Sequence, residues 1–165
     1  MIYKAQTDEG QIVIIKFTDQ YNAEAHQLLA NQGLSPQLYY VSNNASNRWQ
    51  MIVMDIIDHI NINAIIEHNQ RLHVFSEVKR ALDILHREDM VFGDLRLPNI
   101  LVSSVGEQTH VKLVDFDWCG KEGMAKYPSI LNPDCAWPEG VKPCGLLSKS
   151  HDLYWLENLR KSLNI

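Results

Sequence analysis

One stretch, residues 86–117, constrains the fold of this chain more than any other. Asp94 and Asn99 lie five positions apart, directly before a short apolar strand predicted at residues 100–102. A polar loop then leads to a second short strand at 111–114, which ends at Asp115. We expect the two short strands to bring Asn99 and Asp115 close together.

The elements around this stretch favour an α+β fold, because strands and one helix come first and helices with small strands follow. A β-branched run predicts a buried strand at 11–17, and apolar residues three and four positions apart predict a helix at 72–87. The other expected elements are strands at 2–5, 38–41 and 50–57, with a polar loop at 42–48, helices at 20–32, 61–68 and 148–163, and a turn-rich segment at 120–145.

Composition and charge exclude several classes of function. The 165 residues suit one domain, and a net charge of −5 with scattered Lys and Arg argues against a nucleic-acid partner. The longest apolar runs are too short to span a bilayer and no signal peptide is visible, so we expect no membrane partner and an intracellular (cytoplasmic or nuclear) location. The three cysteines form no CxxC pair and are expected to be free thiols. The oligomeric state stays open.

The central stretch resembles the catalytic loop of protein kinases, since Asp94 begins the pattern D-L-x-x-x-N before an apolar strand. Asp115-Phe116-Asp117 resembles their metal-binding D-F-G motif, with Asp in place of Gly. Ile14-Ile15-Lys16 resembles the V-A-I-K strand, and Glu24 lies on the helix that follows. Each motif alone is weak, but their order makes the joint pattern specific. The resemblance covers about residues 2–160.

This resemblance implies a protein-kinase-like two-lobed α+β fold, with a small lobe at about 1–57 and a large lobe at about 58–165. It also implies ATP- and Mg²⁺-dependent phosphotransfer to a hydroxyl, which needs mainly positioning and charge neutralisation. Lys16 would hold the α- and β-phosphates, and Glu24 would orient that lysine through an ion pair of about 4 Å or less. Asp94 would position the hydroxyl, and Arg96 would neutralise the γ-phosphate.

The resemblance further implies a nucleotide pocket and a metal site. Residues 50–57 look like the fifth strand and the hinge of a kinase. Met54 would guard the back of the pocket, the backbone of Asp55 and Ile57 would meet the adenine edge, and two side chains would sandwich the ring. Those two are Ile14 and Leu101, and the implied magnesium ligands are Asn99 and Asp115.

Each of these residues also fits a purely structural role. Lys16 fits an edge-strand lysine, Glu24 fits a solvated helix acid, and the apolar pocket residues fit an ordinary strand core. Asp152 resembles the large-lobe aspartate that ties down the catalytic loop, but it also fits a plain acid at a helix N-terminus.

Several features depart from the kinase pattern. The glycine-rich loop G-x-G-x-x-G-x-V is absent, Gly93 stands where H-R-D has Arg, and no A-P-E is recognisable. The expected fold therefore has a small lobe without the glycine-rich strand and a truncated large lobe. The segment 115–140, with its Tyr-Pro and Trp-Pro-Glu-Gly, resembles protein-kinase-like domains abundant in fungi.

Three functions remain open at this point. A serine/threonine kinase acting on a protein substrate is favoured. The five residues implied for the chemistry are all present, which counts against a pseudokinase: Lys16, Glu24, Asp94, Asn99 and Asp115. A pseudokinase that binds nucleotide without turnover gains from the missing glycine loop. A small-molecule kinase of the aminoglycoside or choline type gains from Gly93-Asp94-Leu95.

Overall fold

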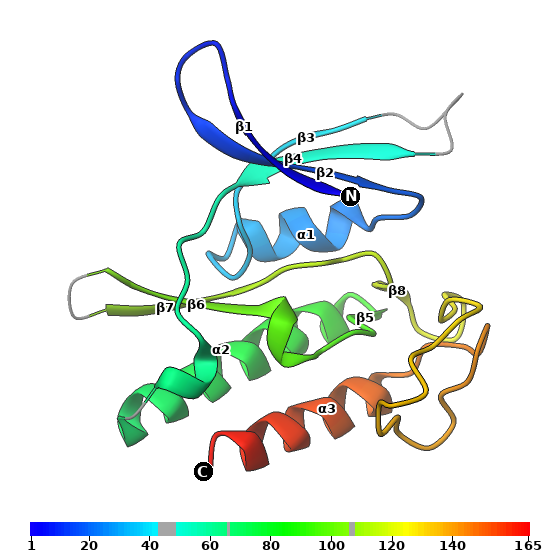
Figure 1. Ribbon diagram of the computed structural model, residues 1–165. Helices are drawn as coiled ribbons and strands as arrows, with labels where there is room; N and C mark the ends of the chain where they lie inside the picture. The colour runs from blue at the N-terminus through cyan, green and yellow to red at the C-terminus, as the bar shows by residue number, and fades with distance from the viewer. Residues whose placement is uncertain (43–48, 66, 106–107) are drawn as a thin grey trace.

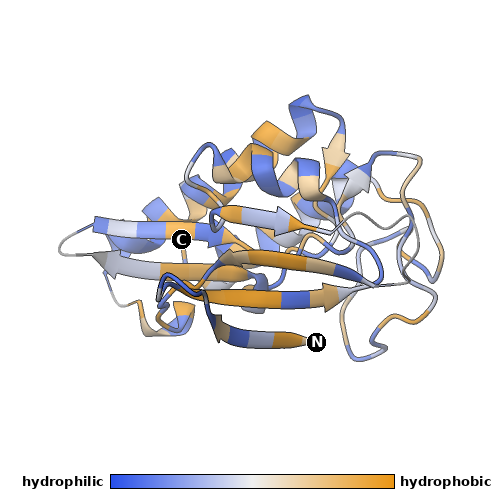
Figure 2. Ribbon diagram, turned by 90° about the horizontal axis from the view of Figure 1, so that it is seen from above, coloured by the Kyte–Doolittle hydropathy of each residue, from blue (hydrophilic) through white to orange (hydrophobic). Residues whose placement is uncertain are grey.

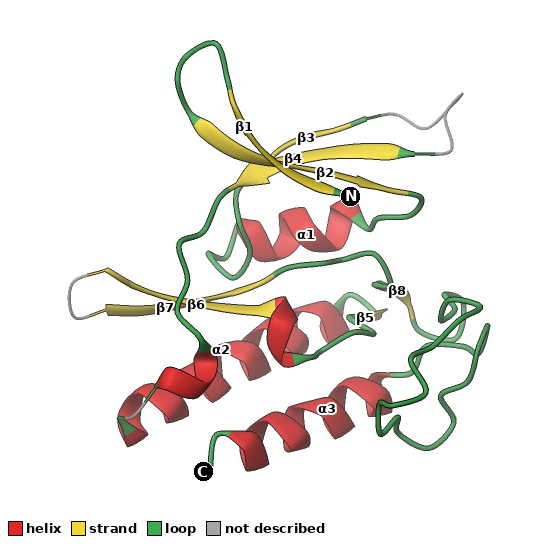
Figure 3. Cartoon of the chain, viewed as in Figure 1, coloured by secondary structure: helices red, strands yellow, loops and turns green. Residues whose placement is uncertain are grey.

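The computed structural model describes residues 1–42, 49–65, 67–105 and 108–165. Almost all of the predicted polar loop at 42–48, and part of the loop at 103–110, lies outside these residues. A four-stranded sheet with one helix beneath it forms the upper part of the molecule in Figure 1, and two longer helices with two small sheets form the lower part. Figure 3 shows the same division by element type, with a long looped segment leading into the last helix. The predicted α+β class is thus confirmed.

The upper sheet is antiparallel, with the strand order β1-β2-β4-β3. Its members are β1 (Ile2–Gln6), β2 (Ile12–Thr18), β3 (Leu38–Val41) and β4 (Gln50–Asp55). The register pairs Ile14 with Met54 and Lys16 with Ile52. Figure 2 shows that hydrophobic residues dominate the strands at the centre of this sheet. Gly10 lies in the turn between β1 and β2, where its φ of 86° is unfavourable for other residues.

Helix α1 (Ala23–Ala30) is shorter than the predicted helix at 20–32. It begins after Asn22, whose side-chain oxygen accepts the Ala25 N–H at 2.9 Å and so caps the first turn. Gly33, with φ of 72°, lies in the turn that follows the helix. The buried face of α1 consists of Ala25, His26 and Leu29.

The lower part contains two long helices, two small antiparallel sheets and two single turns. These are α2 (His68–Arg87), α3 (Lys149–Ser162), the hairpin β6 (Ile100–Val105) with β7 (Gln108–Leu113), the pair β5 (Met90–Val91) with β8 (Gly120–Lys121), and the 3-10 turns η1 (Ile62–Ala64) and η2 (Leu97–Asn99). Helix α2 begins four residues before the predicted position, and the predicted short helix at 61–68 is only the single turn η1. Ser148 caps α3 in a capping box with His151.

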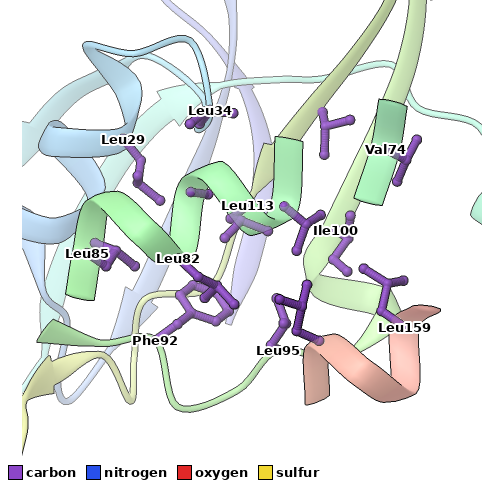
Figure 4. Packing of buried hydrophobic residues seen from close by; sticks show 14 of the residues in the cluster. Leu29, Leu34, Val74, Leu82, Leu85, Phe92, Leu95, Ile100, Leu113 and Leu159 are labelled. Carbon is purple, nitrogen blue, oxygen red and sulfur yellow. The ribbon is translucent and has the colours of Figure 1, made fainter. Parts of the chain in front are cut away.

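One continuous hydrophobic core joins the upper helix to the lower part of the molecule. Leu29 of α1 and Leu34 after it pack in the same cluster as Leu82, Phe92 and Leu113, as Figure 4 shows. The Leu113 N–H also donates to the Leu34 carbonyl at 2.8 Å. Helix α1 is therefore held against the lower part by its own buried face.

Two smaller expectations can be compared with the structure. Cys119, Cys135 and Cys144 are free thiols, as predicted. No helix in the described part of the chain is both long enough and apolar enough to cross a membrane.

Candidate active site

Lys16 lies at the centre of a charged cluster between β2 and the segment after β7. Its side chain is only 8% exposed, and its Nζ lies 2.6 Å from Asp115 Oδ1 and 2.6 Å from Asp117 Oδ1. Lys16 and Thr18 share one face of β2, because side chains two positions apart point the same way. The Thr18 hydroxyl donates to Asp117 Oδ2 at 2.9 Å. One ammonium group therefore faces two carboxylates, in a site where the charges are partly shielded from water.

The charge of Asp117 reflects both burial and its neighbours. Burial raises the pKa of the Asp117 carboxyl, and the nearby charge of Asp115 raises it further. The hydrogen bonds from Lys16 and Thr18 act in the opposite direction and favour the ionised form. Asp115 itself has a φ of 73°, a left-handed conformation that Asp tolerates better than most residues.

The predicted ion pair between Lys16 and Glu24 is wrong. Glu24 is exposed in the first turn of α1, and the ammonium group of Lys16 is already paired with two other acids. The reason lies in the helix geometry, since the buried face is centred between Ala25 and His26 and Glu24 falls roughly opposite it at 100° per residue. Sequence reasoning missed Asp117 as a partner of Lys16. The one feature of the sequence that could have indicated it is the Asp at the position where the D-F-G motif has Gly.

The side chain that α1 does bring to the site is His26. Its ring stacks on Phe116 with centroids 4.9 Å apart and an interplanar angle of 5°. Its Nε2 donates to the Pro36 carbonyl at 2.8 Å, and its Nδ1 accepts from the Tyr21 hydroxyl at 2.6 Å. Burial and the charge of Lys16 lower the pKa of His26 to about 4, so the ring is neutral at physiological pH.

Asp94 is 5% exposed and lies in the loop between β5 and η2. Arg96 contacts both carboxylate oxygens, with Nε 2.5 Å from Oδ1 and Nη2 2.7 Å from Oδ2. Asn99 Nδ2 donates to Asp94 Oδ2 at 2.9 Å. Burial raises the pKa of the Asp94 carboxyl, while Arg96 and Asn99 oppose that shift. Oδ1 accepts a single bond from the described residues and retains a free lone pair.

The loop that carries Asp94 is tied to α3 by Asp152, which is fully buried. Its Oδ2 accepts the Phe92 N–H at 2.8 Å and His86 Nε2 at 2.9 Å, and its Oδ1 accepts the Gly93 N–H at 2.9 Å. Of the two predicted roles for Asp152, the structure supports the one that fixes the loop. Gly93 has a φ of 81°, so this departure from H-R-D supplies a left-handed residue at a tight turn.

Asn99 and Asp115 meet the chemical requirements of a magnesium site. The Asn99 amide donates through Nδ2 to Asp94 O and Oδ2, and no hydrogen bond within the described residues reaches its Oδ1. That oxygen and the Asp115 carboxylate belong to residues that line one cavity, together with Lys16. Magnesium is typically held by one or two carboxylates plus substrate phosphates, so an amide oxygen and a carboxylate at this position fit the ion.

The cavity has a volume of about 530 Å³, within the range of small-molecule sites. It brings together eight residues predicted for the site: Ile14, Lys16, Met54, Asp55, Ile57, Asn99, Leu101 and Asp115. Sequence reasoning did not find Ile2, Pro36, His59 and Val114, which also line it. Asp94, Arg96 and Glu24 are not among its lining residues.

The hydrogen bonds of the hinge backbone can be described, while its contact with an adenine edge stays a prediction. The Asp55 N–H donates to the Gln37 carbonyl at 3.0 Å, so it is not available to an adenine edge. Within the described residues, no backbone carbonyl accepts the Ile57 N–H. His59 Nδ1 lies 3.1 Å from the Ile57 carbonyl, which makes it the donor there.

A strand lysine, a loop asparagine and an aspartate after a small hairpin line one cavity, and a loop aspartate is hydrogen-bonded to the asparagine. This arrangement is that of a protein-kinase-like fold. The solved structure of the Cydia pomonella granulovirus kinase PK-1 matches it with a TM-score of 0.74, at 17% identity over 98% of this chain and 65% of the viral chain. This likeness confirms the predicted fold class.

Sequence similarity points the same way. The chain is 40% identical over 68 residues to protein kinase C-like 1B of Caenorhabditis elegans, 34% over 104 residues to serine/threonine-protein kinase greatwall of Mus musculus, and 30% over 97 residues to serine/threonine-protein kinase akt-2 of C. elegans. These matches cover 41%, 60% and 53% of this chain but only 9%, 12% and 17% of the relatives. No protein-family profile matches the chain. Fold and sequence together support a place in the protein-kinase-like superfamily.

Proposed function

We propose that this chain transfers the γ-phosphoryl group of ATP to a hydroxyl, with serine or threonine of a protein as the acceptor. The observation that carries the proposal is the position of Lys16, Asn99 and Asp115 on one apolar cavity, with Asp94 hydrogen-bonded to Asn99. The sequence similarity to serine/threonine kinases favours a protein acceptor over a small molecule. We treat the chain as one domain whose small lobe ends at about residue 57.

In this proposal the apolar side chains of the cavity hold the adenine. Ile14 and Leu101 contact its two faces, Met54 closes the back, and the Ile57 N–H donates to its edge. Asp55 contributes through the cavity wall rather than through its N–H, which the Gln37 carbonyl occupies. These residues fix the nucleotide so that its phosphates lie toward Lys16.

Lys16, Asn99 and Asp115 then hold the triphosphate end. Lys16 donates to the phosphates. The oxygens of Asn99 and Asp115 would hold Mg²⁺, which would neutralise phosphate charge. Arg96 is the second cation, since a planar guanidinium suits phosphate oxygens as well as the Asp94 carboxylate.

Asp94 orients the acceptor hydroxyl and takes its proton. The hydroxyl oxygen forms a bond to the γ-phosphorus as the bond from that phosphorus to the bridging oxygen breaks, and ADP leaves with the bridging oxygen. The proton passes to the free lone pair on Asp94 Oδ1 and from there to solvent. Such proton transfer contributes roughly 10²–10⁴-fold in rate.

The test replaces Asp94 with Asn and uses Asp89→Asn as its matched control. Asp89 lies a few residues earlier in the chain, just before β5, but it is exposed and pairs with Lys149. Transfer of labelled phosphate from Mg·ATP to generic protein substrates is measured beside nucleotide binding. We expect Asp94→Asn to bind nucleotide like the wild type and to lose roughly 10²–10⁴-fold in transfer, with Asp89→Asn unchanged.

The other outcomes contradict specific parts of the proposal. Equal transfer by the wild type and Asp94→Asn removes Asp94 from the mechanism. Tight Mg·ATP binding without any transfer identifies a pseudokinase, and transfer only to small alcohols replaces the protein acceptor. Absence of nucleotide binding by the wild type refutes the function altogether.

The likeness of segment 115–140 to fungal domains stays a proposal from sequence, because the relatives named above are animal proteins.

A further inference from the structure

Two carboxylates contact Lys16, and they approach it from different surroundings. Asp115 lines the 530 Å³ cavity together with Lys16 and Asn99. Asp117 does not line that cavity and instead borders a separate hollow beside Tyr21 and Glu24. Asp115 therefore faces the proposed ligand, and Asp117 contacts the lysine from outside the ligand space.

Asp117 is held in this position through its own carboxylate. Oδ1 accepts from Lys16 at 2.6 Å, and Oδ2 accepts from the Thr18 hydroxyl at 2.9 Å. Lys16 and Thr18 are two positions apart on β2, so the carboxylate bridges two side chains of one rigid strand face. Its side chain is 23% exposed, against 39% for Asp115.

The backbone around Asp117 is also fixed. The Asn22 N–H donates to the Phe116 carbonyl at 3.1 Å, and Asn22 Nδ2 donates to the Cys119 carbonyl at 3.2 Å. Phe116 is fully buried, stacked on His26 and perpendicular to Phe92. Asp117 thus lies on a short segment whose two ends, residues 116 and 119, are both hydrogen-bonded to Asn22, the N-cap of α1.

We propose that Asp117 is the positioning residue for Lys16, in the place where the sequence pattern pointed to Glu24. This inference rests on the proposed function. It gives the two acids separate tasks, because Asp117 holds the lysine from outside the cavity, whereas Asp115, whose Oδ1 also contacts Lys16 at 2.6 Å, offers its other oxygen to a cation beside Asn99. Without Asp117, the ammonium group retains only Asp115, and lysine and Mg²⁺ compete for one carboxylate.

The competition of Lys16 and Mg²⁺ for Asp115 predicts different effects on nucleotide and Mg²⁺ binding when Asp117 or Glu24 is replaced. Asp117→Asn keeps the size of the side chain and an acceptor for Thr18, but it removes the charge next to Lys16. Glu24→Gln removes the acid that the sequence predicted as the partner, and Asp19→Asn is the matched control on an exposed acid next to β2. Asp117→Glu restores the charge with one more methylene.

The first measurement is binding of a fluorescent ATP analogue as Mg²⁺ is titrated. We expect Asp117→Asn to weaken nucleotide binding about tenfold, the effect of one charge-assisted hydrogen bond at a half-buried site. We also expect the Mg²⁺ concentration at half-saturation to rise several-fold, and Asp117→Glu to reverse part of that rise. Glu24→Gln and Asp19→Asn should match the wild type. A merely structural role for Asp117 would lower thermal stability and leave the Mg²⁺ half-saturation unchanged, and that result overturns the proposal.

The second measurement needs no nucleotide. Labelling of Lys16 by an amine-reactive ester, followed by peptide mass spectrometry, should be several-fold faster in Asp117→Asn than in the wild type or Glu24→Gln. Equal labelling in Asp117→Asn and the wild type, or faster labelling in Glu24→Gln, overturns the assignment of Asp117. Failure of the wild type to bind nucleotide, with the labelling contrast intact, instead refutes the proposed function and with it the division of tasks.

Discussion

Replacing Asp152 with Asn tests how the loop that carries Asp94 is held. The buried carboxylate accepts the N–H groups of Phe92 and Gly93 on different oxygens, and His86 as well. An amide has one acceptor oxygen, so one of the two N–H groups loses its partner, at about 1–3 kcal/mol for a buried donor. The hydrogen bond that remains then has an uncharged acceptor, which lowers the free energy of unfolding by about 1 kcal/mol more. We therefore expect the free energy of unfolding to fall by about 2–4 kcal/mol.

For a domain of this size, 1 kcal/mol corresponds to about 2–4 °C in melting temperature, so Asp152→Asn should melt about 4–16 °C below the wild type. Thermal unfolding followed by circular dichroism measures this shift. Asp83→Asn is the matched control, because Asp83 is an exposed partner of Lys79 on α2 and its loss costs under about 0.5 kcal/mol. A melting temperature for Asp152→Asn that matches that of the control would refute the assignment of Asp152 as the anchor of the loop.

Two further predictions concern the same core. The pKa of His26 is lowered to about 4 in the folded chain, so between pH 6.5 and pH 4 the unfolded chain binds a proton that the folded chain does not. Stability should therefore fall by about 2 kcal/mol from pH 7.5 to pH 5 in urea unfolding, with a flatter profile in His26→Gln but not in the exposed-residue control His68→Gln. Gly93→Ala should lower the urea midpoint more than Gly123→Ala: both have positive φ, but a Cβ at 93 would lie 3.3 Å from Leu147 whereas one at 123 meets nothing within 4 Å. Equal midpoints for the two glycine variants would show that the contact at Gly93 is unimportant.

The prediction of the cavity rests on the resemblance to kinases, which implied roles for its lining residues. Ile14 and Met54 are apolar residues on central strands, and Asn99 and Asp115 flank a short hairpin. Period-two patterning and chain connectivity alone predict the strands and the hairpin but not the cavity that they line. The role of Asp152 likewise came from the resemblance, whereas its place in the first turn of the last helix alone fits a plain acid near a helix N-terminus.

The partner of Lys16 could not be predicted in the same way. The sequence pattern pointed to Glu24 alone, whereas Lys16 pairs with Asp115 and Asp117. Whether Glu24 can reach the lysine depends on where α1 begins. Asn22 caps the helix so late that Glu24 enters the first turn on the exposed side. That start is itself fixed by bonds from Asn22 to residues 116 and 119, about 95 positions away in the chain. A tertiary contact of this kind leaves no periodic signal in the sequence.

The segment 116–119 therefore links parts of the molecule that the sequence presents as separate motifs. Its first residue, Phe116, packs between His26 of α1 and Phe92 before the Asp94 loop, and its second, Asp117, binds β2 through Lys16 and Thr18. A shift of α1 would move the Phe116 stack and the Asn22 bonds together, and so would move the carboxylate that holds the lysine. Helix α1 is thus connected to Lys16 through the segment 116–119 rather than through an acid of its own, and Glu24 is exposed.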